Sequence, residues 1–391
     1  MTSKVRLGII GLGAQGSMYA KFITDGLVPN MEIGAIADRD PAKASVAEAE
    51  YGVPFFENYL DLLDSGTVDA VVTCVPHYLH PEIGINALAR DVHALVEKPA
   101  GVYTKQVAEL NAFAATKPEL TFGIMFNQRN NPLYIRIKEI VDSGEIGKIR
   151  RTNWIITTWW RPQGYYDQSE WRATWGGEGG GVLVNQAPHQ LDLLQWICGV
   201  PKSVYAKVAY GFRRNIAVED EVTAVVDYGD GATGVFVTAT HDLVGTDRFE
   251  ILGDQGKIVV EGSKTATVTR LVKPERELSD GMGIDEVRQL FTGRLNIAEL
   301  YTQEIIEFDS AWGAQHSGVL HNFAANILDG TPLLAPGSDG INGVRLANAI
   351  HLSSWKGQEV PLDFDEDEFL AELNKRIREE GTFGEGFVLN L

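Results

Sequence analysis

The chain has 391 residues, 44% of them hydrophobic, so it is long enough for two domains of ordinary size and too apolar to be disordered throughout. Lys and Arg number 34 against 53 Asp and Glu, and the net charge of -19 repels phosphate backbones and anionic membrane surfaces. Composition therefore argues against nucleic acid and membranes as partners.

The cysteines and the start of the chain indicate the compartment. Cys74 and Cys198 lack the C-x-x-C spacing of redox and zinc motifs, so we expect two reduced, buried thiols. Residues 1–10 read as a strand leading into glycines, without the long apolar region and cleavage site of a signal peptide. No apolar run is long enough to cross a bilayer. These features predict a cytoplasmic protein.

The first third of the chain alternates short apolar runs with helical stretches. Strands are expected at 4–10, 31–37, 69–75, 93–96 and 122–126, and helices at 14–23, 41–51, 81–89 and 105–115. Such alternation predicts right-handed crossovers and a parallel sheet. We therefore expect a doubly wound Rossmann domain over residues 1–126.

A glycine fingerprint, G-x-G-x-x-G, follows the first strand and opens the first helix. Gly11 permits the tight turn, Gly13 lets the backbone approach a pyrophosphate, and Gly16 allows close packing of helix on strand. The free amides of the first helical turn, with Ala14 and Gln15, then face the anion. The motif predicts dinucleotide binding.

An acidic residue, Asp38, ends the second strand 22 positions after Gly16. It is expected to accept hydrogen bonds from the adenosine ribose and to repel a 2'-phosphate, which favours NAD. Arg39 beside it could host that phosphate, so NADP stays open. Asp38 is also well placed to cap the helix that starts at Pro41.

A lysine and a proline, Lys98 and Pro99, follow the strand at 93–96. The carboxyl edge of a parallel sheet is where ligands of doubly wound folds bind. Pro99 restricts Lys98 to extended geometry and permits a cis bond, which would turn the lysine into the cleft. The alternative is an ordinary surface lysine.

From residue 127 the pattern changes to longer strands rich in Val, Thr and aromatic residues. Strands are expected at 148–160, 203–212, 221–228, 233–240, 248–252 and 257–261, and helices at 132–143, 187–197, 317–329 and 340–353. Residues 274–316 are polar and helix-compatible, and 364–391 form an acidic tail with an amphipathic stretch at 368–378. The pattern predicts an α+β domain, 127–391, with a mostly antiparallel open sheet covered by helices on one side only. Its open face is expected to meet another subunit in a homodimer or homotetramer.

A histidine segment follows a glycine-rich stretch at 176–181. Pro188 suits a first helical turn, Asn185 lies at or just before the cap, and His189 and Asp192 are three residues apart on one helix surface. A helix cap with a purely structural histidine is the alternative. The fingerprint and Lys98 upstream favour a catalytic role for His189.

In order along the chain, the fingerprint, Pro76 with His80, Glu97-Lys98-Pro99, and the glycines before His189 and Asp192 resemble the glucose-fructose oxidoreductase and inositol dehydrogenase family (Gfo/Idh/MocA). The resemblance implies a Rossmann domain with an open-sheet domain, Lys98 and His189 as catalytic pair, and sugars or polyols as substrates. It further implies that three residues lie at the cofactor, namely Pro76, His80 and Glu97, and that two contact substrate, namely Arg129 and His316. The family often has aspartate where this chain has Asn185, an amide that can still bind a substrate hydroxyl.

The physical chemistry agrees with this assignment. Oxidising a secondary alcohol removes a hydride from carbon and a proton from oxygen, and a neutral histidine such as His189 is a suitable base. Lys98, as ammonium, would hydrogen-bond the same oxygen and stabilise developing alkoxide. The nicotinamide cofactor performs the hydride chemistry.

Aromatic residues and arginines crowd into residues 159–175, which hold four of the eight tryptophans. Aromatic faces stack on the apolar side of pyranose rings, while arginines bind hydroxyls or an acid group. Core packing is the alternative for any single ring. The candidates for sugar contact are Trp159, Arg161, Arg172 and Trp175, together with Lys98, Asn185 and His189.

His77 and His80 could suggest a metal site with His189, but zinc sites want three or four ligands at recognisable spacing, so no metal is expected. We predict an NAD(P)-dependent dehydrogenase acting on a ring hydroxyl of a sugar, glycoside or cyclitol. Two alternatives remain: a glycosidase of the same family that retains NAD, and a sugar- or NAD-sensing regulator without turnover.

Overall fold

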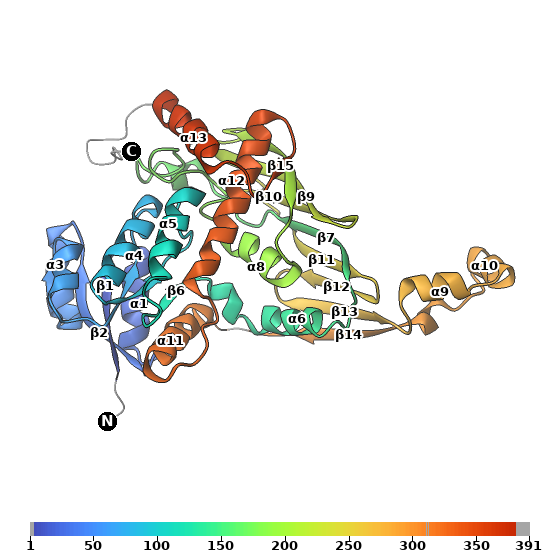
Figure 1. Ribbon diagram of the computed structural model, residues 1–391, viewed down its shortest axis with the longest axis horizontal. Helices are drawn as coiled ribbons and strands as arrows, with labels where there is room; N and C mark the ends of the chain where they lie inside the picture. Colours follow the sequence, from blue (N-terminus) through green and yellow to red (C-terminus); the bar gives the residue numbers. More distant parts are fainter. Residues whose placement is uncertain (1–3, 310, 312, 381–391) are drawn as a thin grey trace.

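The computed structural model describes residues 4–309, 311 and 313–380. Its elements form two sheets with helices packed on them, one built from the first third of the chain and one from the rest (Figure 1). Both predicted sheet types are confirmed.

The N-terminal sheet is parallel, in the order β3-β2-β1-β4-β5-β6. Its strands are β1 (Val5–Ile10), β2 (Met31–Ala37), β3 (Phe55–Phe56), β4 (Ala70–Thr73), β5 (His93–Val96) and β6 (Phe122–Ile124). The connecting helices are α1 (Ala14–Thr24), η1 (Pro41–Lys43), α2 (Ala44–Val46), η2 (Ala47–Tyr51), α3 (Tyr59–Asp64), η3 (His77–Leu79), α4 (His80–Ala89) and α5 (Thr104–Ala114). Strand order reverses beside β1, which is where doubly wound folds bind ligands.

The register of the central strands determines what reaches the ligand edge. Ile10 pairs with Thr73, and Thr73 pairs with Val96, so the three strands end level with one another. The residues that come next, Gly11 and Glu97 among them, therefore lie at one edge of the sheet. The glycine fingerprint and Lys98 meet there although 82 positions separate Gly16 from Lys98.

The second sheet has the order β14-β13-β12-β11-β7-β10-β9-β8-β15 and is antiparallel except between β7 and β10. Its strands are β7 (Ile149–Ile156), β8 (Ser203–Tyr210), β9 (Glu219–Gly229), β10 (Ala232–Ala239), β11 (Asp247–Gly253), β12 (Gly256–Glu261), β13 (Thr265–Leu271), β14 (Tyr301–Glu307) and β15 (Val360–Pro361). The predicted mostly antiparallel sheet is confirmed.

Helices cover one face of this sheet. They include α6 (Pro132–Asp142), α8 (Pro188–Cys198), α12 (Gly340–Lys356) and α13 (Glu366–Glu380), whose apolar residues share one core with the strands. At its centre Trp154 is fully buried and stacks on Phe249 with ring centroids 4.2 Å apart. On the opposite face Ile155, Tyr205 and Val225 are exposed. Buried and exposed residues alternate along β7, β8 and β9, because only one face of the sheet is covered.

One predicted helix covers the other sheet. The helix expected at 317–329, α11 (Ala314–Asp329), was counted as cover for the second sheet, and this was wrong. Its apolar stripe, including Leu320 and Phe323, packs into the core of the N-terminal sheet with Ile9 and Leu95. The chain therefore returns to the Rossmann layer, and an amphipathic pattern alone does not tell which sheet a helix covers.

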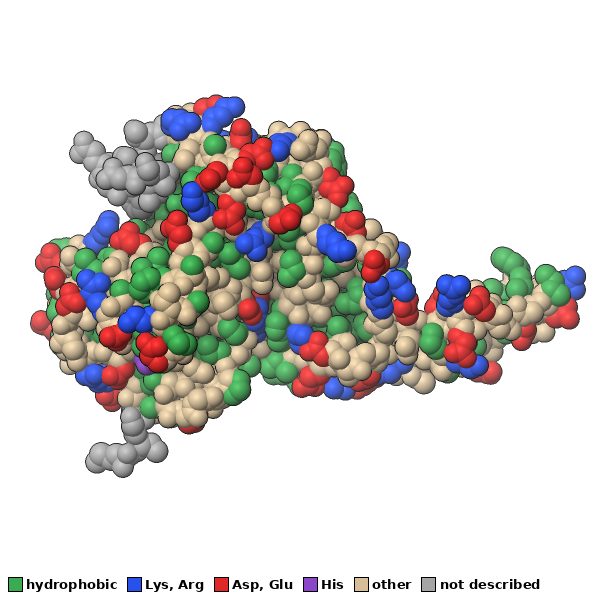
Figure 2. All heavy atoms as spheres, viewed as in Figure 1, with side chains coloured by type: hydrophobic (Ala, Val, Ile, Leu, Met, Phe, Trp, Pro, Cys, Tyr) green, Lys and Arg blue, Asp and Glu red, His purple; other side chains and the backbone are tan. Residues whose placement is uncertain are grey.

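The segment expected to be helix-compatible, 274–316, is part of an arm. It holds α9 (Glu275–Gly281), α10 (Ile284–Phe291), a short turn η5 (Ile297–Leu300) and then β14, which pairs with β13. Neither of these two strands was predicted. Figures 1 and 2 show the arm standing clear of the body, with hydrophobic side chains at its tip. Phe291, the last residue of α10, is 84% exposed. The amphipathic stretch predicted at 368–378 lies in α13, and residues 381–391 of the predicted tail lie outside the described residues.

Candidate active site

The glycine fingerprint forms a tight turn between β1 and α1. Gly11 has φ +95°, and a Cβ there would lie 2.2 Å from the carbonyl oxygen of Cys74. A Cβ on Gly16 would lie 2.0 Å from the carbonyl oxygen of Gly11. In front of Gly13 a Cβ would meet nothing within 4 Å. The turn thus fits a pyrophosphate, because Gly11 and Gly16 are closely packed against protein and open space lies in front of Gly13.

The N-terminus of α1 faces this space. Gly13 is its cap residue and makes no side-chain cap bond, so the cap itself leaves the first-turn amides, those of Ala14 and Gln15 included, without a partner. Such amides and the helix dipole attract an anion. The Gln15 side chain turns inward instead and donates to the hydroxyl of Tyr19 at 2.6 Å.

Asp38 is held against the glycine turn. Its Oδ2 accepts from the backbone N–H of Leu12 at 2.7 Å, and its Oδ1 accepts from the N–H of Asp40 at 2.9 Å. The helix cap is Asp40, whose carboxylate accepts from the N–H of Ala42 at 3.0 Å. Arg39 is exposed beside them. Asp38 therefore stands next to the turn at the end of β2, the place of a ribose-binding carboxylate.

Lys98 reaches across to the second part of the chain. The Lys98–Pro99 peptide is cis, and Lys98 Nζ donates to the backbone oxygen of Asn185 at 2.9 Å. Burial lowers the pKa of Lys98, and the carboxylate of Glu97 opposes that effect. Glu97 is itself buried, accepts from Tyr19 and from the Lys98 backbone N–H, and has its pKa raised by burial. The lysine is thus a desolvated cation next to the hydrogen-bonded carboxyl group of Glu97.

Two histidines lie close enough to Lys98 for its charge to lower their pKa values. His189 lies in the first turn of α8 and His316 in the first turn of α11. Burial lowers the pKa of His189 well below its usual value, and Lys98 lowers it further. Burial and Lys98 also lower the pKa of His316 to about 4. Both imidazoles are therefore neutral near pH 7, and a neutral imidazole can accept a proton.

The Nδ1 of His189 has no hydrogen-bond partner among the described residues. Asp192, three positions on, does not orient it, because both Asp192 oxygens accept from Arg129, at 2.6 and 2.9 Å. His316 lies with its ring nitrogens 3.0 and 3.2 Å from Asn127 Nδ2. Of the two histidines, His189 is the one with an uncommitted ring nitrogen.

A carboxylate missed by the sequence reasoning completes the centre. Glu178, in the glycine-rich stretch, accepts from the amide Nδ2 of Asn185 and, at 3.4 Å, from Arg172. Arg172 also donates to the hydroxyl of Tyr165 at 3.1 Å. Only its position within the glycine-rich stretch 176–181 distinguished Glu178 in the sequence. Asn185, Arg172 and Tyr165 therefore form one network with it.

The aromatic segment divides between the site and the core. Arg161 and Arg172 lie over the ring of Tyr165, 5.1 and 5.0 Å from its centroid, and Trp159 is half-buried nearby in the sequence. Trp175 instead packs among Tyr210, His351 and Trp355 and donates to a backbone oxygen.

Arg129 is likewise enclosed by protein. It is 3% exposed and pairs with Asp192 at 2.6 Å and with Asp339 at 2.7 Å. The structure therefore groups Lys98, Asn185, His189 and His316 and separates Arg129 and Trp175 from that group.

His80 and Pro76 support the turn before α4. Pro76 precedes the short helix η3, and the His80 ring nitrogens lie 2.7 Å from the Pro99 carbonyl and 2.8 Å from the Val75 carbonyl. These contacts tie the end of β4 to the loop that carries Lys98. His77 bonds the backbone oxygen of Glu178 at 3.1 Å, and the described residues contain no cluster of metal-ligating side chains.

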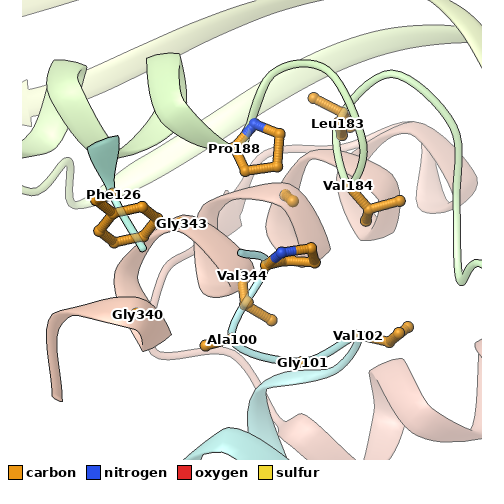
Figure 3. A pocket seen from close by; sticks show the side chains of 12 residues that line it. Ala100, Gly101, Val102, Phe126, Leu183, Val184, Pro188, Gly340, Gly343 and Val344 are labelled. Carbon is orange, nitrogen blue, oxygen red and sulfur yellow. The ribbon is translucent and has the colours of Figure 1, made fainter. Parts of the chain in front are cut away.

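Behind Lys98 and His189 the two segments that carry them pack together. Figure 3 shows an apolar pocket in which Leu183, Val184 and Pro188 face Ala100 and Val344. Its walls are the chain neighbours of Lys98 and His189. This packing therefore fixes the relative position of Lys98 and His189.

Comparisons with known proteins bear on both parts of the chain. The profile "Oxidoreductase family, NAD-binding Rossmann fold" (GFO_IDH_MocA) matches residues 5–123, and the GFO/IDH/MocA C-terminal domain matches 134–259. The chain belongs to the Gfo/Idh/MocA family. As a member it is an NAD-binding oxidoreductase, and the glycine turn, the helix N-terminus and Asp38 fit that cofactor.

Relatives in this family align over most of the chain. The uncharacterized oxidoreductase YrbE of Bacillus subtilis is 27% identical, covering 94% of this chain and 99% of that protein. An inositol 2-dehydrogenase of Rhizobium meliloti is 26% identical, covering 88% and 95%. The WlbA dehydrogenase of Bordetella pertussis, solved with NADH and UDP-GlcNAcA, has a TM-score of 0.77 at 25% identity, covering 93% and 100%.

Within the described chain, no helix is long and apolar enough to span a membrane.

Proposed function

We propose that this Gfo/Idh/MocA protein transfers a hydride between NAD and a ring secondary hydroxyl of a sugar, glycoside or cyclitol. The observation that carries the proposal is that Lys98 Nζ donates to the backbone oxygen of Asn185, four residues before His189, at 2.9 Å, and that the charge of Lys98 lowers the pKa of that imidazole. Residues 1–126 would hold the cofactor, and 127–391 the substrate and the subunit contact. Cys74 and Cys198 are both unpaired, in keeping with a cytoplasmic location.

Each catalytic group has a defined task in this proposal. The imidazole of His189 accepts the hydroxyl proton, and its low pKa keeps it free of a proton beforehand. Lys98 donates a hydrogen bond to the same oxygen and stabilises its developing negative charge in a desolvated site. Bound NAD supplies the hydride acceptor. Pro76, His80 and Glu97 hold the loop at the nicotinamide end.

The substrate is proposed to lie against the segment 159–172 and the start of α11. Tyr165, Trp159 and the two arginines over the Tyr165 ring offer the aromatic and charged surface that sugars bind. His316 also borders the site in this proposal, because the charge of Lys98 lowers the pKa of both His316 and His189. Arg129 and Trp175, also predicted to contact substrate, would act through the packing around them.

The test is NADH formation by the native protein with NAD, and then NADP, against sugars, methyl glycosides, sugar acids and inositols. Sustained NADH growth with one compound supports the proposal and identifies the substrate class. Cleavage of a glycoside without net NADH would replace the proposal with a glycosidase that retains NAD. NAD binding without any turnover would leave a sensor.

Cofactor choice is expected to depend on Asp38. Replacing it with serine removes the charge that repels a 2'-phosphate and leaves Arg39 able to bind one. The ratio of the dissociation constants for NADP and NAD should fall about tenfold or more. Isothermal titration of each cofactor measures this. Asp40→Ala, which removes the neighbouring helix cap, is the control, and an equal change in both variants would contradict the role of Asp38.

The open face of the second sheet is proposed to join two copies of the chain. One cross-strand row on this face consists of Val225 in β9 and its two partners, Tyr205 in β8 and Val235 in β10. Val225 is 46% exposed on this face. A symmetric contact would bury the row against its counterpart.

Replacing Val225 with lysine is expected to weaken this association at least about tenfold, because an unpaired ammonium would be buried. Sedimentation over a dilution series measures the dissociation constant. Leu27→Lys, an exposed leucine of the Rossmann layer, should leave it unchanged. Unaltered assembly of the Val225 variant would place the subunit contact elsewhere.

A further inference from the structure

The carboxylate of Glu178 is buried beside the catalytic groups. Its side chain is 2% exposed, and burial raises its pKa. Its Oε2 accepts from the backbone N–H of Ala173 at 2.7 Å, and its Oε1 accepts from Asn185 and Arg172. A buried carboxylate stays ionised only when such donors compensate it. Glu178 has three.

Contact with this carboxylate fixes which way the Asn185 amide faces. An amide has two donors on nitrogen and an acceptor on oxygen, whereas an ionised carboxylate only accepts. The Nδ2 of Asn185 must therefore face Glu178, and it also lies 3.5 Å from the hydroxyl of Tyr165. Among the residues that the structure describes, none bonds Asn185 Oδ1. That oxygen is left to accept from a substrate hydroxyl.

Glu178 also contributes to the charge balance at Lys98. The backbone oxygen of Asn185 holds Lys98 Nζ, so Glu178 and Lys98 contact the same residue. Glu97 and Glu178 each favour the ammonium form of Lys98, while burial and Arg172 disfavour it.

Other titratable groups lie near Glu178 and Lys98, but none of them takes over the effect of the Glu178 carboxylate on Lys98. Glu219 faces it from β9 and spends its own oxygens on the backbone N–H groups of Gly181 and Leu183, at 2.8 and 2.9 Å. The groups that remain are four histidines within the field of Lys98, namely His77, His80, His189 and His316. Burial lowers the pKa of all four, so they are neutral near pH 7 and do not compensate the charge of Lys98 as a carboxylate does.

We propose that Glu178 is a positioning residue of the catalytic centre, which orients the Asn185 amide with its oxygen toward the substrate and supports the ammonium form of Lys98. The proposal rests on the proposed function for the substrate hydroxyl. The effect on Lys98 is independent of any substrate.

The first experiment follows competitive acylation of Lys98 by acetic anhydride against pH, read by mass spectrometry of the peptide that carries it. In Glu178→Gln the ammonium loses a neighbouring negative charge, so Lys98 should react about three- to tenfold faster at a fixed neutral pH and titrate at a lower pH. The alkaline limb of kcat/KM should move in the same direction. Because the Asn185 side-chain amide is then free to flip, KM should rise and kcat should fall, while NAD affinity stays the same.

A charge-transposed variant provides the sharper test. In Glu178→Gln/Asn185→Asp the carboxylate moves to position 185 and the amide to 178, so the Lys98 titration should return toward native and activity should exceed that of Glu178→Gln. Asn185→Asp alone brings two carboxylates into contact and should be the least active of the three. Glu178→Asp keeps the charge and should titrate as the native protein does, which preserves the test if Glu178→Gln fails to fold.

Glu380→Gln is the matched control. Its carboxylate accepts from the N–H groups of Trp175 and Gly176, at 3.0 and 3.1 Å, in the same stretch of chain but without contact to Asn185. That variant should change stability and leave the Lys98 titration alone. A native titration in Glu178→Gln, with no gain in the transposed variant, would overturn the proposal. A shifted titration in a protein that oxidises nothing in the sugar panel would overturn only the proposed function.

Discussion

Replacing Lys98 with methionine is expected to lower kcat by a factor of about 10²–10⁴ while the protein still binds NAD. Methionine keeps the apolar stem and removes only the ammonium, which donates to Asn185 and to the proposed alkoxide. The glycine turn, α1 and Asp38 are untouched, so the pyrophosphate and ribose contacts remain. Steady-state NADH formation measures kcat, and isothermal titration measures NAD affinity.

The matched control is Lys105→Met. Lys105 is a lysine of α5 whose ammonium pairs with Asp367 on the surface, at 2.7 Å. Its loss should leave both quantities nearly native. Turnover by Lys98→Met within about tenfold of native would remove Lys98 from the chemistry, whereas loss of NAD binding would show that Lys98 acts through the cofactor site instead.

Local signals were sufficient to predict the N-terminal sheet and the dinucleotide turn. The strands that carry Gly11 and Lys98 are short apolar runs, and a parallel sheet brings their carboxyl ends to one edge whatever lies between them. The glycine pattern is visible in the local sequence, and the fold shows why it is needed: Gly16 packs on Gly11 in the same turn, and Gly11 packs on Cys74 at the end of β4. The family comparison agrees with this half over residues 5–123.

Long-range contacts decided what the sequence did not predict. Glu178 resembles any loop glutamate until the fold buries it against Asn185. The helix α11 has an apolar stripe that suits either sheet, and Phe323 shows its true partner only in the packed core. The strand β14 lies in the segment expected to be helix-compatible, and only its pairing with β13 in the second sheet shows that it is a strand. Pairing partners in a sheet and burial of a single charge depend on residues far away in sequence.

The burial of Arg129 leads to the largest expected effect on stability. Arg129 and Asp192 are both nearly inaccessible and bonded through two N–H groups, while Asp339 on the other side of the guanidinium is partly exposed. Arg129→Met leaves the Asp192 carboxylate buried without a cation. The free energy of unfolding should fall by about 3–5 kcal/mol above neutral pH.

The loss in Arg129→Met should depend on pH in a defined direction. Burial raises the pKa of Asp192 to about 6 although Arg129 lowers it, so removing the arginine raises that pKa further. Below pH 6 Asp192 is protonated in both folded proteins and the difference is smallest; as pH rises past 6 only the native protein holds the ionised form, and the difference grows. Urea unfolding at pH 5.5 and pH 8 measures both values. Arg129→Met/Asp192→Asn should recover most of the loss at pH 8, and Arg150→Met, which breaks a solvated pair with Asp254, should show little change at either pH. A pH-independent loss that the second substitution does not relieve would mean that Arg129 stabilises the fold through packing on Phe126 and Trp196 rather than through charge.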